Sequence, residues 1–229
     1  MTKSALSQAF VIWFLAITCA ASPAAFAQEE AAGRRGLRLT TEALTVENRD
    51  GDPLYQFARF QVIDDDGYTV EGARGTYESS TETLRAWGDA SQMVKIAKEG
   101  EESFTITASQ SLEVRFASES LRAEGKVEYR GSGATARAEL LLVDEWQRLR
   151  ELVESLLDSV ADEESRALVE AFFSGLEPTG RLFLMIGGVE IEREDAQLAA
   201  DWAAFTEDDE RFVSAGGRAP IELRLDRER

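Results

Sequence analysis

The sequence contains no histidine and only one cysteine, Cys19. Histidine is the commonest general base and metal ligand in proteins, so its absence removes the usual catalytic triads and zinc sites. Paired carboxylates can still hydrolyse glycosidic bonds, but the acidic residues lie mostly in turn-like or helical stretches. We therefore predict that the protein is not an enzyme, assign no catalytic or metal-binding residue, and expect no cofactor. A glycosidase-like β-protein is the alternative, and it requires a buried pair of acids in a cleft.

Basic residues are also scarce, with 25 lysine and arginine residues against 43 aspartate and glutamate residues. The formal net charge is −18, and the sequence contains no basic patch. Such a surface repels nucleic acids and anionic membranes, so we expect no nucleic-acid partner. Two acidic runs, residues 64–66 and 207–210, lack the spacing of an EF-hand loop. We interpret them as solvated turns, and weak binding of divalent cations is the alternative.

The first 27 residues have the three parts of a secretory signal peptide. Lys3 gives a short positive region, residues 9–21 form an almost uncharged apolar run, and Ala25-Phe26-Ala27 supplies a small-x-small cleavage site. This pattern predicts cleavage after Ala27 and export of residues 28–229 as a single domain. Because the only cysteine lies in the removed segment, the mature chain must fold without a disulfide. An uncleaved membrane anchor is the alternative, although the run is shorter than the ~20 residues of a membrane span.

Most of the mature chain alternates apolar and polar residues, which is typical of half-buried β-strands. Leu112, Val114 and Phe116 share one face of such a strand, and turn-forming residues mark positions 48–51 and 64–67. Alternation places the following residues on apolar faces: Leu84, Ala86, Phe104, Ile106, Leu112, Val114, Phe116, Leu121, Ala123, Val127, Tyr129, Leu182, Leu184, Ile186, Val189 and Ile191. A dry core and a ligand-lined groove produce the same pattern, so both interpretations stay open at this point.

One segment, residues 144–178, changes to a helical period. Trp146, Leu149 and Val153 follow one another at helical steps, and charged residues occupy the opposite side. An acidic interruption at residues 162–164 divides the segment into two helices. We therefore predict a helical hairpin inserted into a β-protein. Its apolar stripe either packs against the sheet or belongs to a lid or partner-docking element.

The β-strands contain an internal repeat with a glycine near its end. Residues 83–90 (TLRAWGDA) align with residues 120–127 (SLRAEGKV), and weaker copies occur at 181–189 and 211–217. Successive repeat glycines are 37, 63 and 29 residues apart, and the long middle interval contains the predicted hairpin. The hairpin is therefore an insertion within one ordinary repeat. A glycine in each repeat permits a bend, and regularly spaced bends fold a meander of strands into two facing sheets.

The compound pattern is an alanine-led strand, a turn and then Leu-x-Ala-x-Gly-x-Val, and it resembles the LptA/OstA-like family of periplasmic lipopolysaccharide-transport proteins. Residues 73–88 match most clearly and residues 112–127 next, within a resemblance that covers 37–143 and 179–225. The resemblance implies a mainly β fold, an open β-jellyroll, located in the periplasm. It also implies that the apolar faces line a groove for the acyl chains of lipopolysaccharide or a similar glycolipid. The helical hairpin has no counterpart in this family.

The resemblance further implies that terminal strands pair with neighbouring jellyroll domains, because a free edge offers unpaired backbone donors and acceptors. The candidate edge residues are Leu39, Leu44, Ile221, Leu223 and Leu225. The expected partners are an acylated glycolipid, related jellyroll domains of the transport machinery and further copies of this chain, head to tail. Cleavage of the N-terminal segment favours an LptA-like position, and retention favours an LptC-like, membrane-anchored one. The alternative function is an envelope β-repeat scaffold without lipid cargo.

Overall fold

The protein is mainly β, with two helices inserted late in the chain. The computed structural model describes residues 25–28, 36–49, 51–98, 103–131, 133–158, 160, 163–177, 179–193, 196–206, 211–216 and 221–224. The elements are β1 (Ala25–Gln28), β2 (Leu37–Arg49), β3 (Asp52–Asp64), β4 (Tyr68–Glu78), β5 (Thr83–Trp87), β6 (Val94–Lys98), β7 (Phe104–Ala108), β8 (Ser111–Arg115), the 3-10 helix η1 (Phe116–Ser118), β9 (Ser120–Gly131), β10 (Ala134–Glu145), α1 (Trp146–Leu157), α2 (Glu163–Ser174), β11 (Arg181–Arg193), β12 (Ala196–Thr206), β13 (Arg211–Ala215) and β14 (Ile221–Arg224). The predicted jellyroll-like β fold with a helical insertion is confirmed, and α1 and α2 form the insertion.

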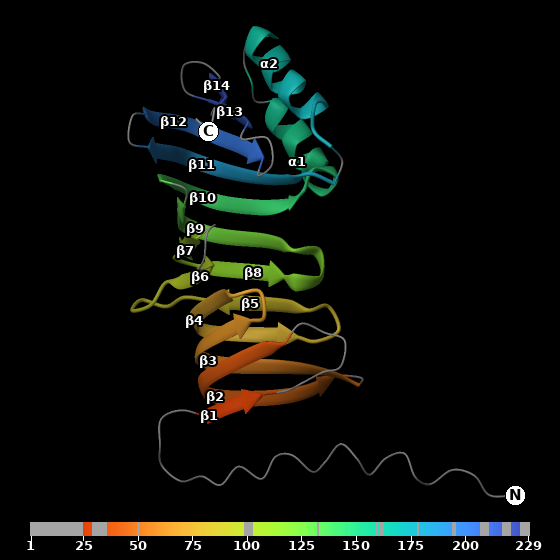
Figure 1. Ribbon diagram of the computed structural model, residues 1–229, viewed down its shortest axis with the longest axis vertical. Helices are drawn as coiled ribbons and strands as arrows, with labels where there is room; N and C mark the ends of the chain where they lie inside the picture. The colour runs from red at the N-terminus through yellow and green to blue at the C-terminus, as the bar shows by residue number, and fades with distance from the viewer. Residues whose placement is uncertain are drawn as a thin grey trace, which may run out of the picture.

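All the described strands belong to one antiparallel sheet, stacked along the long axis of the molecule (Figure 1). The main path runs β1-β2-β3-β4-β5-β8-β9-β10-β11-β12-β13-β14. Beside this path, β6 pairs with β4 and β7, and β7 also pairs with β9. The sheet therefore has an N-terminal end at β1 and β2 and a C-terminal end at β13 and β14.

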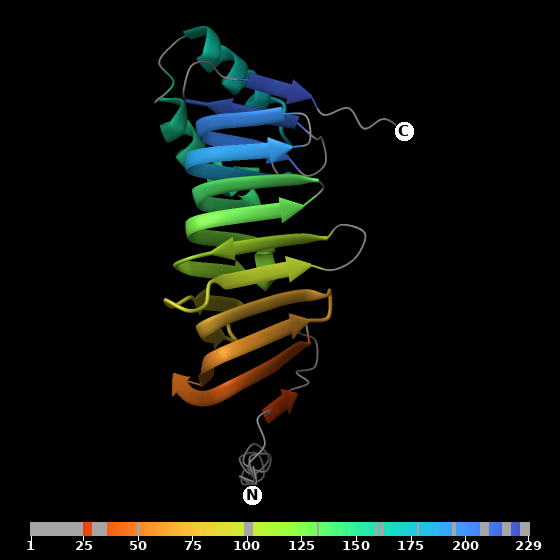
Figure 2. The same ribbon diagram turned by 90° about the vertical axis from the view of Figure 1, so that its left-hand side faces the viewer.

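The long strands bend near their middle, so the sheet folds over on itself (Figure 2). The pairing register of β9 and β10 shifts at this bend, between Ala138 and Leu140. Gly125 and Gly187 occupy the bend with φ of 77° and 85°, a conformation that other residues adopt only with strain. Bends occur as predicted at the repeat glycines Gly125 and Gly188, whereas β5 ends before Gly88 and Gly217 lies outside the described residues. The architecture also needs one correction. A single continuous sheet, rather than two separate sheets, supplies both facing layers.

We call the two layers wall A and wall B, the fold between them the bend line, and the opposite side, where the strands end, the mouth. Wall A consists of residues 43–49, 52–58, 74–78, 83–87, 111–115, 120–124, 140–145, 181–186, 202–206, 211–215 and 221–224. Wall B consists of residues 25–28, 37–41, 60–64, 68–72, 94–98, 104–108, 127–131, 134–138, 189–193 and 196–200.

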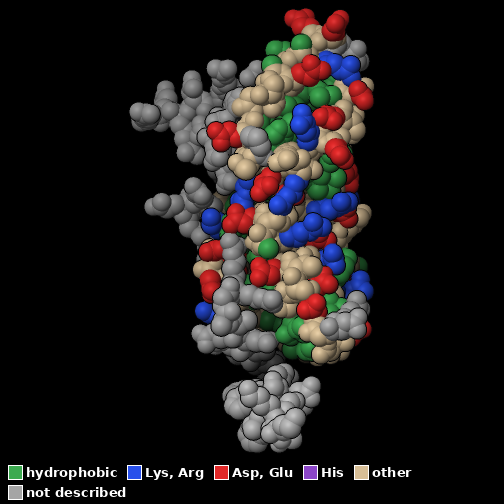
Figure 3. Space-filling view, turned by 90° about the vertical axis from the view of Figure 1, so that its right-hand side faces the viewer, with side chains coloured by type: hydrophobic (Ala, Val, Ile, Leu, Met, Phe, Trp, Pro, Cys, Tyr) green, Lys and Arg blue, Asp and Glu red, His purple; other side chains and the backbone are tan. Residues whose placement is uncertain are grey.

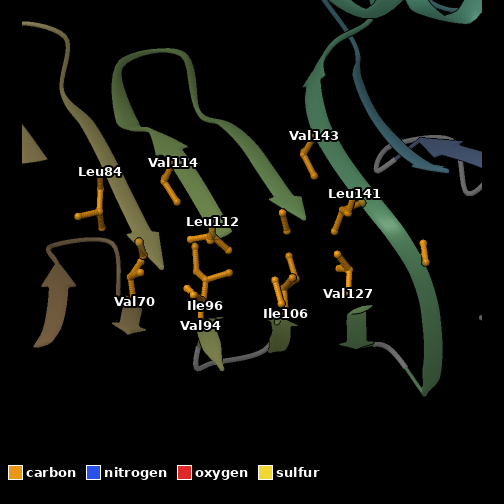
Figure 4. Packing of buried hydrophobic residues seen from close by; sticks show 14 of the residues in the cluster. Val70, Leu84, Val94, Ile96, Ile106, Leu112, Val114, Val127, Leu141 and Val143 are labelled. Atoms are coloured by element: carbon orange, nitrogen blue, oxygen red, sulfur yellow. The ribbon is translucent and has the colours of Figure 1, made fainter. Parts of the chain in front are cut away.

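One apolar cluster fills the space between the walls (Figure 4). Cross-strand partners form rows along the inner face of wall A, such as Ala86, Leu112, Ala123, Leu141 and Met185. A facing row on wall B contains Val70, Ile96 and Ile106. A fully buried aliphatic side chain contributes about 1.5–3 kcal/mol to stability. The shared cluster therefore holds the two walls together.

The helical hairpin covers the outer face of wall A at the C-terminal end. Leu149 and Val153 of α1 and Phe172 and Phe173 of α2 are buried in a second apolar cluster against this face. The sheet contributes Leu182, Leu184, Trp202, Ala204, Val213 and Ala215 to it. The hairpin therefore packs on the outer face of the sheet, outside the space between the walls, as the first of its two predicted roles requires.

The outer faces elsewhere carry paired charges. On wall A, Glu113 accepts a hydrogen bond from Arg85 at 2.8 Å and forms an ion pair with Arg115 at 2.8 Å. Partial burial disfavours the charged Glu113 carboxylate, but the bonds from these arginines outweigh burial and lower its pKa. On wall B, Arg137 lies 3.0 Å from Glu128. Figure 3 shows cationic and anionic side chains intermixed along one long side of the molecule.

Candidate functional site

The candidate site is the apolar interior where it reaches the mouth. Core side chains of the inner cluster are buried, whereas a further set packs on the same cluster and stays only partly buried. This set comes from both walls and consists of Leu37, Leu39, Tyr55, Tyr68, Tyr77, Phe104, Leu121, Tyr129, Phe183, Ile191, Leu198 and Phe205. Most of these residues lie three to five positions from the bend of their strand. They form an apolar rim, and such a surface is available to an apolar ligand.

Behind the rim, protein side chains fill the interior. Leu84, Ala86, Ala108 and Ala123 are all 0% exposed. Surface hollows of about 500 and 400 Å³ lie elsewhere, lined mainly by outer-face and strand-end residues. The rim is therefore the part of the apolar interior that solvent or a ligand can contact, and the space behind it is filled.

Aromatic rings connect the walls across the C-terminal half of the mouth. On wall B, the Phe104 ring centroid lies 6.0 Å from that of Tyr68 and 6.3 Å from that of Tyr129. Tyr129 lies 6.4 Å from Phe205 of wall A, and Phe205 stacks on Phe183 at 4.8 Å. An aromatic pair contributes about 0.5–1.5 kcal/mol beyond its buried area. Each ring contact therefore adds only a small part of the energy that holds the two walls together.

At the N-terminal end, no ring contact among the described residues connects the two walls across the mouth in this way. Leu44 and Val46 of β2 are 37% and 47% exposed. Both lie on the inner face, because their cross-strand partners are the inner-face residues Phe57 and Tyr55. The apolar inner face therefore continues to the end of the sheet.

The structure brings thirteen of the sixteen predicted lining residues together in the inner cluster. They are Leu84, Ala86, Phe104, Ile106, Leu112, Val114, Phe116, Leu121, Ala123, Val127, Tyr129, Val189 and Ile191. Of these, Phe104, Leu121, Tyr129 and Ile191 belong to the rim, and the others are buried. Whether they contact a lipid stays a prediction.

The placement of Leu182, Leu184 and Ile186 on the inner face is wrong. These residues lie on the outer face of wall A, in the cluster under the hairpin. β11 is buried on both faces here, and its sequence is a continuous apolar run from residue 182 to 186 rather than an alternating one. The inner residues of this strand are Phe183 and Met185.

Sequence reasoning also missed several rim residues, namely Tyr55, Tyr68, Tyr77, Leu198, Phe183 and Phe205. Tyr55 alternates with Phe57 in β3, so a longer reading of that strand would have found it. Phe183 and Phe205 lie in runs without alternation, where only the tertiary structure decides the face.

In wall B, β1 and residues 196–200 of β12 have a single neighbour among the described residues, and in wall A two strand segments do. Residues 43–49 of β2 pair only with β3, and β14 pairs only with β13. Of the predicted edge residues, Leu44 lies in the first segment and Ile221 and Leu223 in the second. Leu39 instead lies in the wall B half of β2, which pairs with both β1 and β3. Leu225 lies outside the described residues.

The predicted cleavage position falls within β1, where Ala27 pairs with Leu39 of β2. Cleavage after Ala27 removes three of the four residues of β1 and leaves the wall B half of β2 as an additional edge. Residues 1–24, which include most of the predicted signal peptide, lie outside the described residues. No helix in the described part of the chain is long and apolar enough to cross a membrane.

The first acidic run shapes a turn. Asp64, the one buried carboxylate among the described residues, accepts a hydrogen bond from the backbone N–H of Tyr68 at 2.8 Å. Asp65 accepts one from the N–H of Gly36, also at 2.8 Å. No group of three or more carboxylate, histidine or cysteine side chains in the described ranges has the geometry of a metal site. The second acidic run, residues 207–210, lies outside them.

The similarity of this chain to known proteins is structural and distant. No protein-family model matches the chain, and no curated protein matches it significantly. Among solved structures, the chain is similar to LptH of Pseudomonas aeruginosa, the LptA-homologous periplasmic component of the lipopolysaccharide transport device. The TM-score is 0.41 and the sequence identity 10%, over 47% of this chain and 75% of that chain.

Proposed function

We propose that this protein is a non-catalytic periplasmic carrier of lipopolysaccharide or a similar acylated glycolipid. Acyl chains lie against the rim and between the walls, and the protein forms part of a bridge between the inner and outer membranes. One observation carries the proposal: the apolar inner face runs from exposed Leu44 and Val46 at one end to partly buried Phe183 and Phe205 near the other. A continuous apolar strip that stays partly accessible to solvent marks a candidate ligand or partner site. The LptA/OstA-like sequence pattern and the signal-peptide pattern support the same function.

The chemistry of the site suits the lipid tail better than the head group. Each CH₂ group removed from water contributes about 0.8 kcal/mol, so a few acyl chains suffice for stable binding. The net charge of −18 disfavours close contact with anionic head groups. Head groups therefore stay in solvent at the mouth, where divalent cations can bridge them to the protein.

A pair of adjacent residues in β4 tests the proposal. Tyr77 lies on the rim, whereas Thr76 lies on the outer face of the same strand. With the photoreactive residue p-benzoylphenylalanine at position 77, illumination in purified lipopolysaccharide should attach lipid to the protein, and position 76 should give little. Equal labelling at both positions, or none at either, would contradict a lipid site between the walls.

The intact mass of protein from its native envelope tests the localisation. A mature chain beginning at Gln28 supports a soluble periplasmic carrier after cleavage of the signal peptide. A chain that retains its N-terminus supports the membrane-anchored, LptC-like alternative. Lipids extracted from the same sample and identified by mass spectrometry give the natural cargo.

An envelope scaffold without lipid cargo is the second candidate function. The filled interior favours it, because Leu84, Ala86 and their neighbours are fully buried without a ligand. Lipid-free protein from the native envelope, together with no labelling at Tyr77, would favour the scaffold.

A further inference from the structure

The two edge segments of wall A run in the same direction. In β2, residues 43–49 run from the bend line to the mouth. In β14, Ile221 pairs with Ser214 near the bend line and Arg224 pairs with Arg211 near the mouth, so β14 runs the same way. A second copy can extend the stack so that its wall A continues wall A of the first copy. In that arrangement, β2 of the second copy pairs in parallel with β14 of the first. This arrangement places the outer face of one wall A directly beside the outer face of the next.

The hairpin reaches this junction. In Figure 1, α2 stands at the C-terminal end of the stack and extends past β13 and β14. Its inward face, with Val169, Phe172 and Phe173, is buried on its own sheet. Its outward face is exposed, and Leu168 on that face is 44% exposed. The charged residues there are acidic, because Glu163, Glu164 and Glu170 are exposed while Arg166 bonds back to the C-terminus of α1.

The N-terminal end of the next copy presents a hollow on the same face. Its volume is about 500 Å³, and it is lined by Ala43, Thr45, Gln56, Phe57, Ala58, Arg74, Gly75, Thr76 and Trp87. Small side chains leave the hollow open, Trp87 is half-buried, and Arg74 is its one charged lining residue.

This hollow occupies the same row of the sheet as the surface that the hairpin already covers. Ala58, Arg74 and Trp87 are successive cross-strand partners on the outer face. The row continues through Ser111, Glu124 and Leu140 to Ile186 and Trp202 beneath the hairpin. Helices thus cover one end of the row, whereas no helix in the described part of the chain covers the other end, around Trp87.

We propose that α2 of one copy docks into this hollow on the next copy, with Leu168 against the small residues and its acidic neighbours near Arg74. A stable interface buries roughly 1,000 Å² or more, which is more than one face of a 12-residue helix supplies. The helix contact therefore acts together with the parallel strand pairing. It determines that wall A of the next copy, rather than its wall B, continues wall A of the first. This inference rests on the bridge role of the proposed function, with copies joined head to tail as the sequence resemblance implies, and it is independent of lipid binding.

Disulfide trapping tests the contact in the full chain with Cys19→Ala, which leaves no other cysteine. The variant with Leu168→Cys and Thr45→Cys should form covalent dimers and longer ladders on mild oxidation. A mixture of the two single variants should give dimers only. The matched control pairs Leu168→Cys with Thr135→Cys on the outer face of wall B, and it should give no ladder. Equal cross-linking by the control pair, or none by the Thr45 pair, would overturn the proposal.

A charge substitution gives a second readout. Leu168→Glu should weaken self-association by about tenfold or more in sedimentation experiments, because a buried apolar anchor is replaced by a charge facing acidic neighbours. An unchanged dissociation constant, or a monomer at every concentration of the unaltered chain, would overturn the docking inference. Lipid labelling at Tyr77, measured on dilute monomer, reports separately on the proposed function. Lipid labelling without cross-linking would contradict only the docking inference. Cross-linking without lipid labelling would contradict only the proposed lipid cargo.

Discussion

Two phenylalanine side chains fill the N-terminal part of the interior by packing over glycines of the neighbouring strand. Phe57 and Phe60 meet edge to face with ring centroids 4.5 Å apart. A Cβ atom at Gly75 would overlap the Phe57 ring and lie 2.7 Å from the Phe60 ring. A Cβ at Gly72 would lie 2.9 Å from Phe60. The absence of side chains in β4 thus makes room for the large rings of β3.

Gly75→Ala should therefore lower the free energy of unfolding by about 1–3 kcal/mol, the usual effect of overpacking a filled core. Chemical denaturation monitored by tryptophan fluorescence measures the change. The double variant with Phe57→Leu should recover part of the loss, because leucine vacates the space that the methyl group needs. A Gly75→Ala protein as stable as the unaltered chain would show that the rings move aside at little cost.

The helical hairpin is the element whose removal is most informative. Glu145 and Arg181 are cross-strand partners at its base, and the N–H of Trp146 donates to the carbonyl of Gly180 at 2.9 Å. A two-residue Asn-Gly turn in place of residues 146–180 therefore joins β10 to β11 without changing their register.

This replacement exposes Leu182, Leu184 and Trp202, so the free energy of unfolding should fall by about 2–5 kcal/mol. Lipid labelling at Tyr77 should persist, because the hairpin lies on the other side of wall A. Substituting threonine at positions 182 and 184 controls for exposure of the outer face and should reduce aggregation. Loss of labelling with an intact sheet would show that the hairpin belongs to the lipid site after all.

Elements differ in how much of their placement the sequence determines. Alternation grouped Leu112 and Val114 correctly because the opposite face of β8 is polar and wet. It failed in β11, where both faces are apolar and only the hairpin's position identifies the inner one. The bends of β9 and β11 followed from Gly125 and Gly188, whereas those of β2 and β3, at Glu42 and Arg59, carry no glycine. The pairing of β5 with β8, past β6 and β7, has no local signal either. The hairpin itself was predictable, but not the face that it covers.

At the scale of the whole molecule, two opposite electrostatic effects accompany acidification. With a net charge of −18, the carboxylates repel one another at neutral pH and destabilise the fold, and protonation relieves that repulsion. In contrast, the ion pairs of the outer faces weaken when their carboxylates become protonated. Hydrogen bonds from Arg122 lower the pKa of Glu124, and bonds from Arg137 and Arg130 outweigh burial to lower that of Glu128. The thermal stability of the unaltered chain alone cannot separate these effects.

The difference between the unaltered chain and Glu113→Gln separates them. The pKa of Glu113 is lower in the folded state than its ordinary value of 4.5, so the ionised carboxylate stabilises the fold. That contribution is present above pH 4.5 and is lost as the pH falls through the lowered folded value. The variant should therefore melt at a lower temperature near pH 7, and the two melting curves should converge below pH 4.5. Glu151→Gln on the exposed side of α1 changes the net charge equally and serves as the control. A Glu113→Gln difference that persists unchanged into acid would assign its effect to packing rather than to the charged pairs with Arg85 and Arg115.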